Sequence, residues 1–369
     1  MTALDPMTVL DLNRPNPPLI VVVGSGGVGK TTLAASLGLV SAEAGHDTLV
    51  MTFDPSKRLK DTLGVDESVG GAEVPVPTDT TGRLHASLLD PRETFDRLVE
   101  RYAPDDEARD RILSNRYYDH MSGHLGGILE YMAVERLYEV ATEGKHQRLI
   151  LDTPPTREAI DFLEAPQRIV DFLDSGALKI ALKQWFADDG QLNVTSGMGF
   201  VGRGLEGFLD RIVGMKLLRD MSEFFRAFGP LFPGFKERAG KVQKLLAERE
   251  TIFVLVTGPG RERIPDTLFF ARRLREAGYH LGPVVVNRVH PMLDGAESLD
   301  TNQDPAGHEL FRWLGTRHSE ALTELQRRLT DQQQVVSLPL VPHEPTDLKS
   351  LTAMGQDLQR VLLAPNASI

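Results

Sequence analysis

A short glycine-rich segment near the start of the chain carries the pattern best suited to chemistry. An apolar run, residues 19–23, leads into Gly24-Ser25-Gly26-Gly27-Val28-Gly29-Lys30-Thr31-Thr32, which fits the phosphate-binding pattern G-x-x-x-x-G-K-S/T. The glycines let consecutive backbone N–H groups point into one concavity, and a helix that begins near Lys30 adds its positive end there. The segment predicts a nucleotide-binding protein. A glycine-rich hairpin turn that binds nothing is the alternative, but it would not need strand, loop and helix in this order.

Four side chains have predicted roles in binding a nucleotide and its metal ion. We expect Lys30 to reach the outer phosphates and the Thr31 hydroxyl to ligate Mg²⁺. Asp54 and Asp152 each follow an apolar run that reads as a strand. Ligands of an open α/β sheet sit at the carboxyl ends of its strands, so we expect both acids near the loop, with Asp152 binding Mg²⁺ directly or through water. The alternatives are a turn residue for Asp54 and a helix N-cap for Asp152.

The expected nucleotide is ATP. Recognition of guanine usually requires Asn-Lys-x-Asp after a late strand, but the chain has Asn287-Arg288-Val289-His290 there, with no acid in place. Asn287 is a candidate for a hydrogen bond to the adenine edge, and an ordinary strand-end turn residue is the equal alternative. The ten histidines form no i, i+4 pair with a general base, which does not support a zinc protease site.

Composition narrows the class of protein and its partners. The formal net charge of −11 over 369 residues argues against nucleic acid or an anionic membrane surface as the main partner. There is no cysteine, which removes disulfides and thiolate metal sites. The polar, proline-rich start does not look like a signal peptide, and no run approaches the roughly 18–20 apolar residues that a membrane span needs. We expect a soluble, cytoplasmic protein with no nucleic-acid partner and no direct membrane insertion.

Strands alternate with helices along most of the chain, which predicts an α/β fold: a mostly parallel sheet with helices on both faces. Apolar runs predict strands at residues 19–23, 48–53, 84–89, 148–151, 251–257, 282–286 and 335–338.

The helical span 158–249 breaks this alternation and predicts an inserted α-helical subdomain, with a helical contribution from about 103–145. Residues 1–18 then form a loose N-terminal extension. Residues 19–157 and 250–369 form the P-loop nucleotide-binding domain.

The predicted insert carries an apolar stripe whose members recur at three- and four-residue spacing: Phe208, Ile212, Met215, Leu218, Met221, Phe225 and Phe228. These side chains would share one face of a helix. They either pack into the protein's own core or form an apolar groove, assembled in the ATP state, for a hydrophobic client protein.

Taken together, these residues resemble the arsenical-pump ATPase family, which includes targeting factors for tail-anchored membrane proteins. The similarity runs from about residue 19 to 363. It is carried by the glycine-rich loop, Asp54-Pro55-Ser56-Lys57-Arg58-Leu59-Lys60-Asp61, Asp152-Thr153-Pro154-Pro155-Thr156, Asn287 and Leu338-Pro339-Leu340-Val341-Pro342. The resemblance implies a Mg²⁺-dependent ATPase that works as a dimer and couples hydrolysis to handling of a client or partner protein.

The resemblance also implies roles for individual residues. Asp54 matches the acid that activates the attacking water, and Asp152 begins the segment that matches the second switch. The adenine pocket is matched by residues that follow two late strands, Asn287, Pro339, Val341 and Pro342.

Departures from the family pattern leave open whether the protein works as a homodimer or as a heterodimer. The family's extra lysine, which reaches the phosphates of the partner subunit, falls at Ser25, so a homodimer would hydrolyse ATP slowly by this route. A heterodimer with a lysine-bearing relative would supply that charge, whereas a nucleotide-gated scaffold with weak ATPase activity would not need it. The absence of cysteine removes the arsenite-binding thiolates. A spatial organiser similar to the chromosome-partitioning ATPases fits less well, because the closing helix lacks a basic amphipathic stripe.

Overall fold

The computed structural model describes residues 10–16, 18–53, 62–65, 71–114, 128–154, 156–174, 231–292, 305–329 and 333–364. Asp54 and the apolar stripe from Phe208 to Phe228 lie outside the described residues. The chain divides into two compact units. The first unit comprises Met1–Leu89, Glu139–Ile160 and Leu245–Ile369, and the second comprises Asp90–Tyr138 and Asp161–Lys244.

The described part of the first unit contains an eight-stranded sheet in the order β3-β4-β2-β5-β1-β6-β7-β8. All neighbouring strands are parallel except β3 and β4, which are antiparallel. The predicted α/β fold with a mostly parallel sheet is confirmed. The strands are β1 Leu19–Gly24, β2 Thr48–Thr52, β3 Val74–Pro75, β4 Leu84–Leu88, β5 Arg148–Asp152, β6 Thr251–Thr257, β7 Leu281–Val289 and β8 Val335–Pro339.

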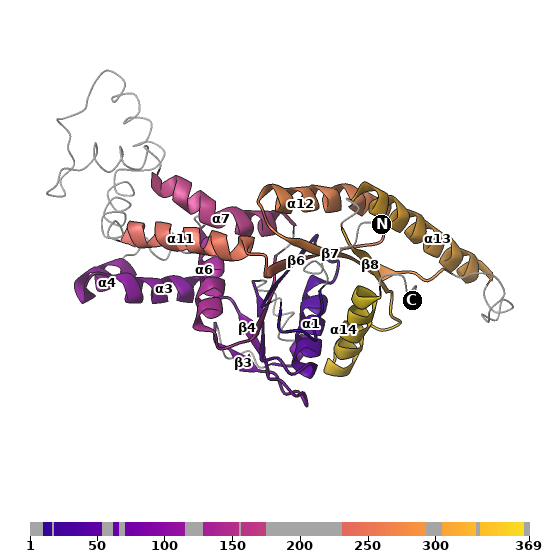
Figure 1. Cartoon of the computed structure of the whole chain (residues 1–369), viewed down its shortest axis with the longest axis horizontal. Helices are drawn as coiled ribbons and strands as arrows, with labels where there is room; N and C mark the ends of the chain where they lie inside the picture. Colours follow the sequence, from indigo (N-terminus) through magenta and orange to yellow (C-terminus); the bar gives the residue numbers. More distant parts are fainter. Residues whose placement is uncertain are drawn as a thin grey trace, which may run out of the picture. The chain divides into compact units, whose positions relative to one another are not determined.

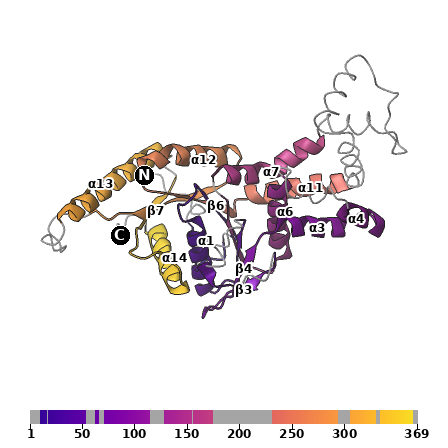
Figure 2. The ribbon, with the colours of Figure 1, turned by 180° about the vertical axis from the view of Figure 1, so that it is seen from behind.

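Helices cover both faces of this sheet. Helices α1 (Lys30–Glu43) and α14 (Leu348–Leu363) pack together on one face, and α12 (Ile264–Glu276) and α13 (Pro305–Arg328) lie over the other (Figures 1 and 2). A short 3₁₀ turn, Arg261–Arg263, precedes α12. No helix in the described ranges is both long and apolar enough to cross a membrane.

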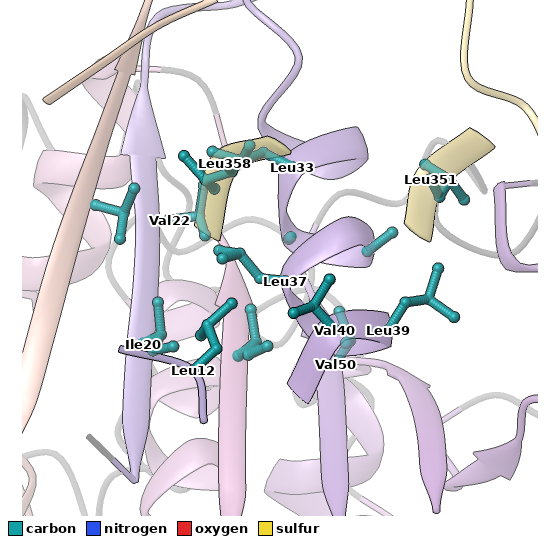
Figure 3. Packing of buried hydrophobic residues seen from close by; sticks show 14 of the residues in the cluster. Leu12, Ile20, Val22, Leu33, Leu37, Leu39, Val40, Val50, Leu351 and Leu358 are labelled. Atoms are coloured by element: carbon teal, nitrogen blue, oxygen red, sulfur yellow. The ribbon is translucent and has the colours of Figure 1, made fainter. Parts of the chain in front are cut away.

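The core of the first unit forms where α1 and α14 meet the sheet. Strand β1 is buried along its whole length between β5 and β6, which explains its unbroken run of apolar residues. Leu33 and Leu37 of α1, Val22 of β1 and Leu358 of α14 belong to one buried cluster (Figure 3). The two helices approach closely because α14 has Gly355 at the contact, where a Cβ atom would lie 2.5 Å from the Ser36 carbonyl oxygen. This packing fixes α1, and with it the loop that precedes α1.

The N-terminal segment differs from its prediction as a loose extension. Within the described residues 10–16, Leu10 and Leu12 are buried in the core of the first unit. The Leu12 N–H donates to Oε1 of Gln359 (3.0 Å), and the guanidinium of Arg148 donates to the Leu12 carbonyl (2.9 Å). Burial lowers the pKa of Arg148 to about 10, which leaves the group charged at neutral pH. Because a buried cation needs acceptors, the segment that supplies the carbonyl is part of the core.

The regular secondary structure described in the second unit is helical. It contains α3 (Pro91–Tyr102) and α4 (Asp106–Leu113), and most of α6 (Ile128–Glu143), α7 (Thr156–Asp174) and α11 (Phe232–Ala247). Phe95, Val99, Tyr131 and Phe235 lie in its apolar core. The described parts of the predicted insert, α7 and α11, are helical as expected, and the domain boundaries themselves stay a prediction.

Candidate nucleotide-binding site

The loop between β1 and α1 has a backbone that only glycine adopts easily. Gly24, Gly27 and Gly29 have φ angles of 149°, 76° and 93°, in the region that L-residues rarely enter. At Gly24 a Cβ atom would lie 2.1 Å from the Val256 carbonyl oxygen, so strand β6 also excludes any side chain. The sequence pattern therefore has a physical cause at each of these three positions.

Positive charge gathers at the start of α1. Lys30 is buried, and its ammonium donates to the Ser25 carbonyl across the loop (3.1 Å). No acidic residue lies in the first turn of α1, and the positive end of a helix favours an anion. The loop, Lys30 and the helix terminus together fit a phosphate group.

A hydroxyl and a carboxylate meet beside this loop. The Thr31 hydroxyl donates to Oδ2 of Asp152 (2.7 Å), and Asp152 ends strand β5 with only 1% of its surface exposed. Mg²⁺ takes hard oxygen ligands and is commonly bound by one or two carboxylates together with substrate phosphates, so these two side chains fit that ion. The structure brings Thr31 and Asp152 together, and their role in binding metal stays a prediction.

Thr52 is a site residue that the sequence analysis missed. Its hydroxyl also donates to Oδ2 of Asp152 (3.0 Å), because β2 and β5 are parallel neighbours with Thr52 and Asp152 in register. Thr153 ties the next segment to the central strand, since its N–H and hydroxyl both donate to the Val22 carbonyl (3.2 and 2.8 Å). The Asp152 carboxylate is thus held by one hydroxyl from helix α1 and one from strand β2.

We expect Thr52→Val to lower the free energy of unfolding by about 1.5–3 kcal/mol, the usual contribution of a hydrogen bond to a charged group. Valine keeps the shape of threonine and removes only the donor. Urea unfolding of the full chain measures the change. Thr323→Val is the control, because that exposed hydroxyl on α13 donates to the Ser319 carbonyl. Equal effects of the two substitutions would show that Asp152 does not depend on Thr52.

A pocket of about 420 Å³ opens next to the loop, and its walls come from Thr32, from the ends of β7 and β8, from the segment after β8 and from α14. Leu338, Pro339, Leu340, Val341 and Met354 make much of the lining. Such an apolar pocket suits a planar base. The structure brings the predicted residues Asn287, Pro339 and Val341 to this pocket, but Pro342 is not among the lining residues. Their contacts with adenine stay a prediction, as does the role of Asp54, which lies outside the described residues.

The end of β7 contacts the loop through two side chains. Asn287 Nδ2 donates to the Val28 carbonyl (2.9 Å), and Asn287 Oδ1 accepts from the Arg288 N–H (3.0 Å). The Arg288 guanidinium donates to the Gly27 carbonyl (3.2 Å) and to the Glu344 carboxylate (3.1 Å). The Asn287 amide therefore already uses one N–H and one lone pair within the protein.

Fold and site together define the protein as a P-loop NTPase: a central parallel strand, a glycine-rich loop and a helix with Lys30 and Thr31 at its start. Comparison with known proteins finds a family to which part of the chain is similar. Residues 18–187 match the model of the anion-transporting ATPase family.

Individual relatives are similar to the chain over part of its length. The chain is 30% identical to ATPase ARSA1 of Chlamydomonas reinhardtii over 62% of its own length and 33% of the relative. It is 28% identical to ATPase GET3B of Arabidopsis thaliana over 73% of its length and 63% of the relative. It is 31% identical to ATPase ASNA1 homolog 2 of Paramecium tetraurelia over 42% of its length and 46% of the relative. The chain thus matches less than two thirds of the length of each.

Proposed function

We propose that the protein is a Mg²⁺-dependent ATPase whose nucleotide state controls how it handles a client or partner protein. The observation that carries the proposal is the assembly of Lys30, Thr31 and the buried Asp152 carboxylate at the end of the glycine-rich loop. The names of the relatives, all of them ATPases, support ATP as the substrate. We place the protein in the cytoplasm.

Each part of the site has one task in this proposal. The loop from Gly24 to Thr32 and the Lys30 ammonium bind the phosphates, and Asp54 orients the attacking water in line with the terminal phosphate. Mg²⁺, when bound, neutralises charge on the phosphates. Thr31 and Asp152 hold that ion. The apolar pocket next to the loop holds the base.

The working form in this proposal is a dimer, either of two copies or with a related ATPase. Ser25 offers no positive charge to a partner subunit, and its carbonyl accepts from the Lys30 ammonium. A relative with lysine at this position would add the missing charge. Dimer closure would then reshape an apolar surface on the helical insert, where a hydrophobic client binds.

A second candidate is a nucleotide-gated scaffold that binds ATP and hydrolyses it only weakly. Ser25 favours this candidate because its loss of the cross-subunit charge weakens catalysis while sparing binding. Single-turnover hydrolysis, measured for the chain alone and with a lysine-bearing relative, separates the two candidates. Fast turnover of the isolated chain, unaffected by the relative, would contradict both the scaffold and the heterodimer.

Asp54→Asn tests the ATPase proposal. We expect this variant to bind Mg²⁺-ATP with unchanged affinity in calorimetry and to lose hydrolysis by roughly 10²–10⁴-fold, the usual contribution of a positioned base. Asp79→Asn, an exposed acid between β3 and β4, is the matched control and should keep full activity. Undiminished hydrolysis by Asp54→Asn would refute its role, and absence of ATP binding by the unaltered protein would refute the proposed function.

A further inference from the structure

Strand β7 is irregular where it passes the glycine-rich loop. Its pairing with β8 shifts register between Val286 and Val289. Within this irregular stretch Arg288 has a φ of 63°, the one positive value recorded for a non-glycine residue in the described part of the chain. Bulges next to functional sites often redirect a side chain, and such strain persists only where the surroundings hold it. The register shift and the positive φ of Arg288 thus coincide at the part of β7 that passes the loop.

The irregular stretch aims two consecutive side chains at two consecutive carbonyls of the loop. Asn287 donates to the Val28 carbonyl, and Arg288 donates to the Gly27 carbonyl. In a planar trans peptide the C=O and the following N–H point in opposite directions. Side chains that hold these two carbonyls from outside the loop therefore turn the N–H groups of Val28 and Gly29 toward its concave side.

The contact on the Asn287 side is tight. A Cβ atom at Gly29 would lie 2.6 Å from Asn287 Nδ2, so the amide presses directly on the loop backbone. Only 5% of the surface of Asn287 is exposed. The position of this amide is thus fixed by packing as well as by its hydrogen bonds.

Glu344 holds the Arg288 guanidinium in place. The other end of this guanidinium donates to Glu344, which follows β8 and lines the same pocket. Both side chains are substantially exposed, and an exposed ion pair contributes little to stability by itself. Its effect is to keep the guanidinium over the Gly27 carbonyl.

We propose that Asn287 and Arg288 form a brace behind the glycine-rich loop, anchored by Glu344, which sets the direction of the Val28 and Gly29 amides before phosphate arrives. Both are positioning residues that act through the loop backbone. The proposal rests on the proposed function, because it assumes that the loop binds the phosphates of a nucleotide. It gives Asn287 a task that does not depend on the identity of the base.

Calorimetry with Mg²⁺-tripolyphosphate, a ligand without a base, tests the brace. We expect Arg288→Met to weaken binding of tripolyphosphate and of ATP by the same factor, about tenfold. Arg261→Met is the matched control, since that exposed arginine pairs with Glu320 and Glu324 on α13, and it should bind both ligands normally. Equal affinities of Arg288→Met and the unaltered protein for tripolyphosphate would overturn the proposal.

The salt dependence of ligand binding distinguishes a positioning role of Arg288 from simple electrostatic attraction of the phosphates. If Arg288 acted only as a nearby positive charge, the difference between Arg288→Met and the unaltered protein would disappear at 0.5 M salt, roughly the range where exposed charges are strongly screened. A brace predicts that most of the difference remains, because it lies in the orientation of the amides.

Asn287→Ala gives the second arm of the test. We expect it to weaken tripolyphosphate and ATP binding equally, by about fivefold to tenfold. A loss confined to ATP would show that Asn287 contacts the base and would overturn its place in the brace. Failure of the unaltered protein to bind either ligand would instead refute the proposed function, so the two failures are distinguishable.

Discussion

Asp152→Asn is expected to reduce Mg²⁺-dependent ATP hydrolysis by roughly 10²–10³-fold, because it removes the negative charge that would hold the metal ion. The amide oxygen of asparagine can still accept the hydrogen bonds that Thr31 and Thr52 donate to Oδ2 of Asp152. The substitution therefore changes charge while leaving the local contacts largely in place. Phosphate release across a Mg²⁺ titration measures the effect, and circular dichroism checks the fold.

The Mg²⁺ dependence of activity distinguishes a loss of metal binding from a loss of stability. A loss of metal affinity should raise the Mg²⁺ concentration needed for half-maximal activity, which a merely unstable variant would not do. Asp79→Asn, the exposed acid between β3 and β4, is again the control and should keep the original Mg²⁺ curve. Normal activity of Asp152→Asn at low Mg²⁺ would show that this carboxylate takes no part in metal binding.

The parts of the fold that could be predicted are those whose cause is local. The glycine-rich loop is one, since Gly24, Gly27 and Gly29 adopt backbone angles that their own residue type permits. The central strands are another, because burial on both faces requires unbroken apolar runs. Asp152 was found for the same reason, as an acid directly after such a run.

The missed features depend on contacts between distant parts of the chain. A threonine at the end of β2 carries no signal until β5 lies beside it and brings Asp152 into register, 100 residues later. The buried place of Leu12 depends on Arg148, 136 residues away. The positive φ of Arg288 is disfavoured locally, so only the tertiary environment produces it.

Helix α4 lies within the span of about 103–145 for which the sequence predicts a helical contribution, but the sequence analysis gave no bounds for this helix. Its residues, Asp106–Leu113, are mostly charged and show little apolar periodicity. A capping signal was present, however, since the Asp105 side chain accepts from the Ala108 N–H at the start of the helix (2.7 Å). Attention to caps could have placed the start of this helix without any tertiary information.

The core of the second unit contains a buried ion pair that sets up the largest expected change in stability. Glu135 of α6 is fully buried and pairs with Arg238 of α11. The guanidinium lies over the rings of Tyr102 and Tyr138, at 5.1 and 5.4 Å from their centroids. Tyr131 donates its hydroxyl to Glu135 (2.8 Å). Burial tends to lower the pKa of Arg238, but the charge of Glu135 outweighs it and the pKa is raised. Arg238 is therefore charged at neutral pH.

Arg238→Met is expected to lower the free energy of unfolding by about 3–5 kcal/mol, because it leaves the Glu135 carboxylate buried without its counter-charge. Urea unfolding of the full chain measures this loss. Lys241→Met is the matched control on the same helix, since Lys241 pairs with Glu237 in an exposed i, i+4 contact, and such pairs have little effect.

The double variant Glu135→Leu with Arg238→Met tests whether the uncompensated charge of Glu135 causes the loss of stability in Arg238→Met. Removing both charges eliminates the desolvation penalty that the single variant suffers, so the double variant should be more stable than Arg238→Met alone. If the two substitutions instead destabilised additively, the contribution of Arg238 would lie in its packing against Tyr102 and Tyr138. The sign of the coupling therefore separates electrostatics from packing in the core of the second unit.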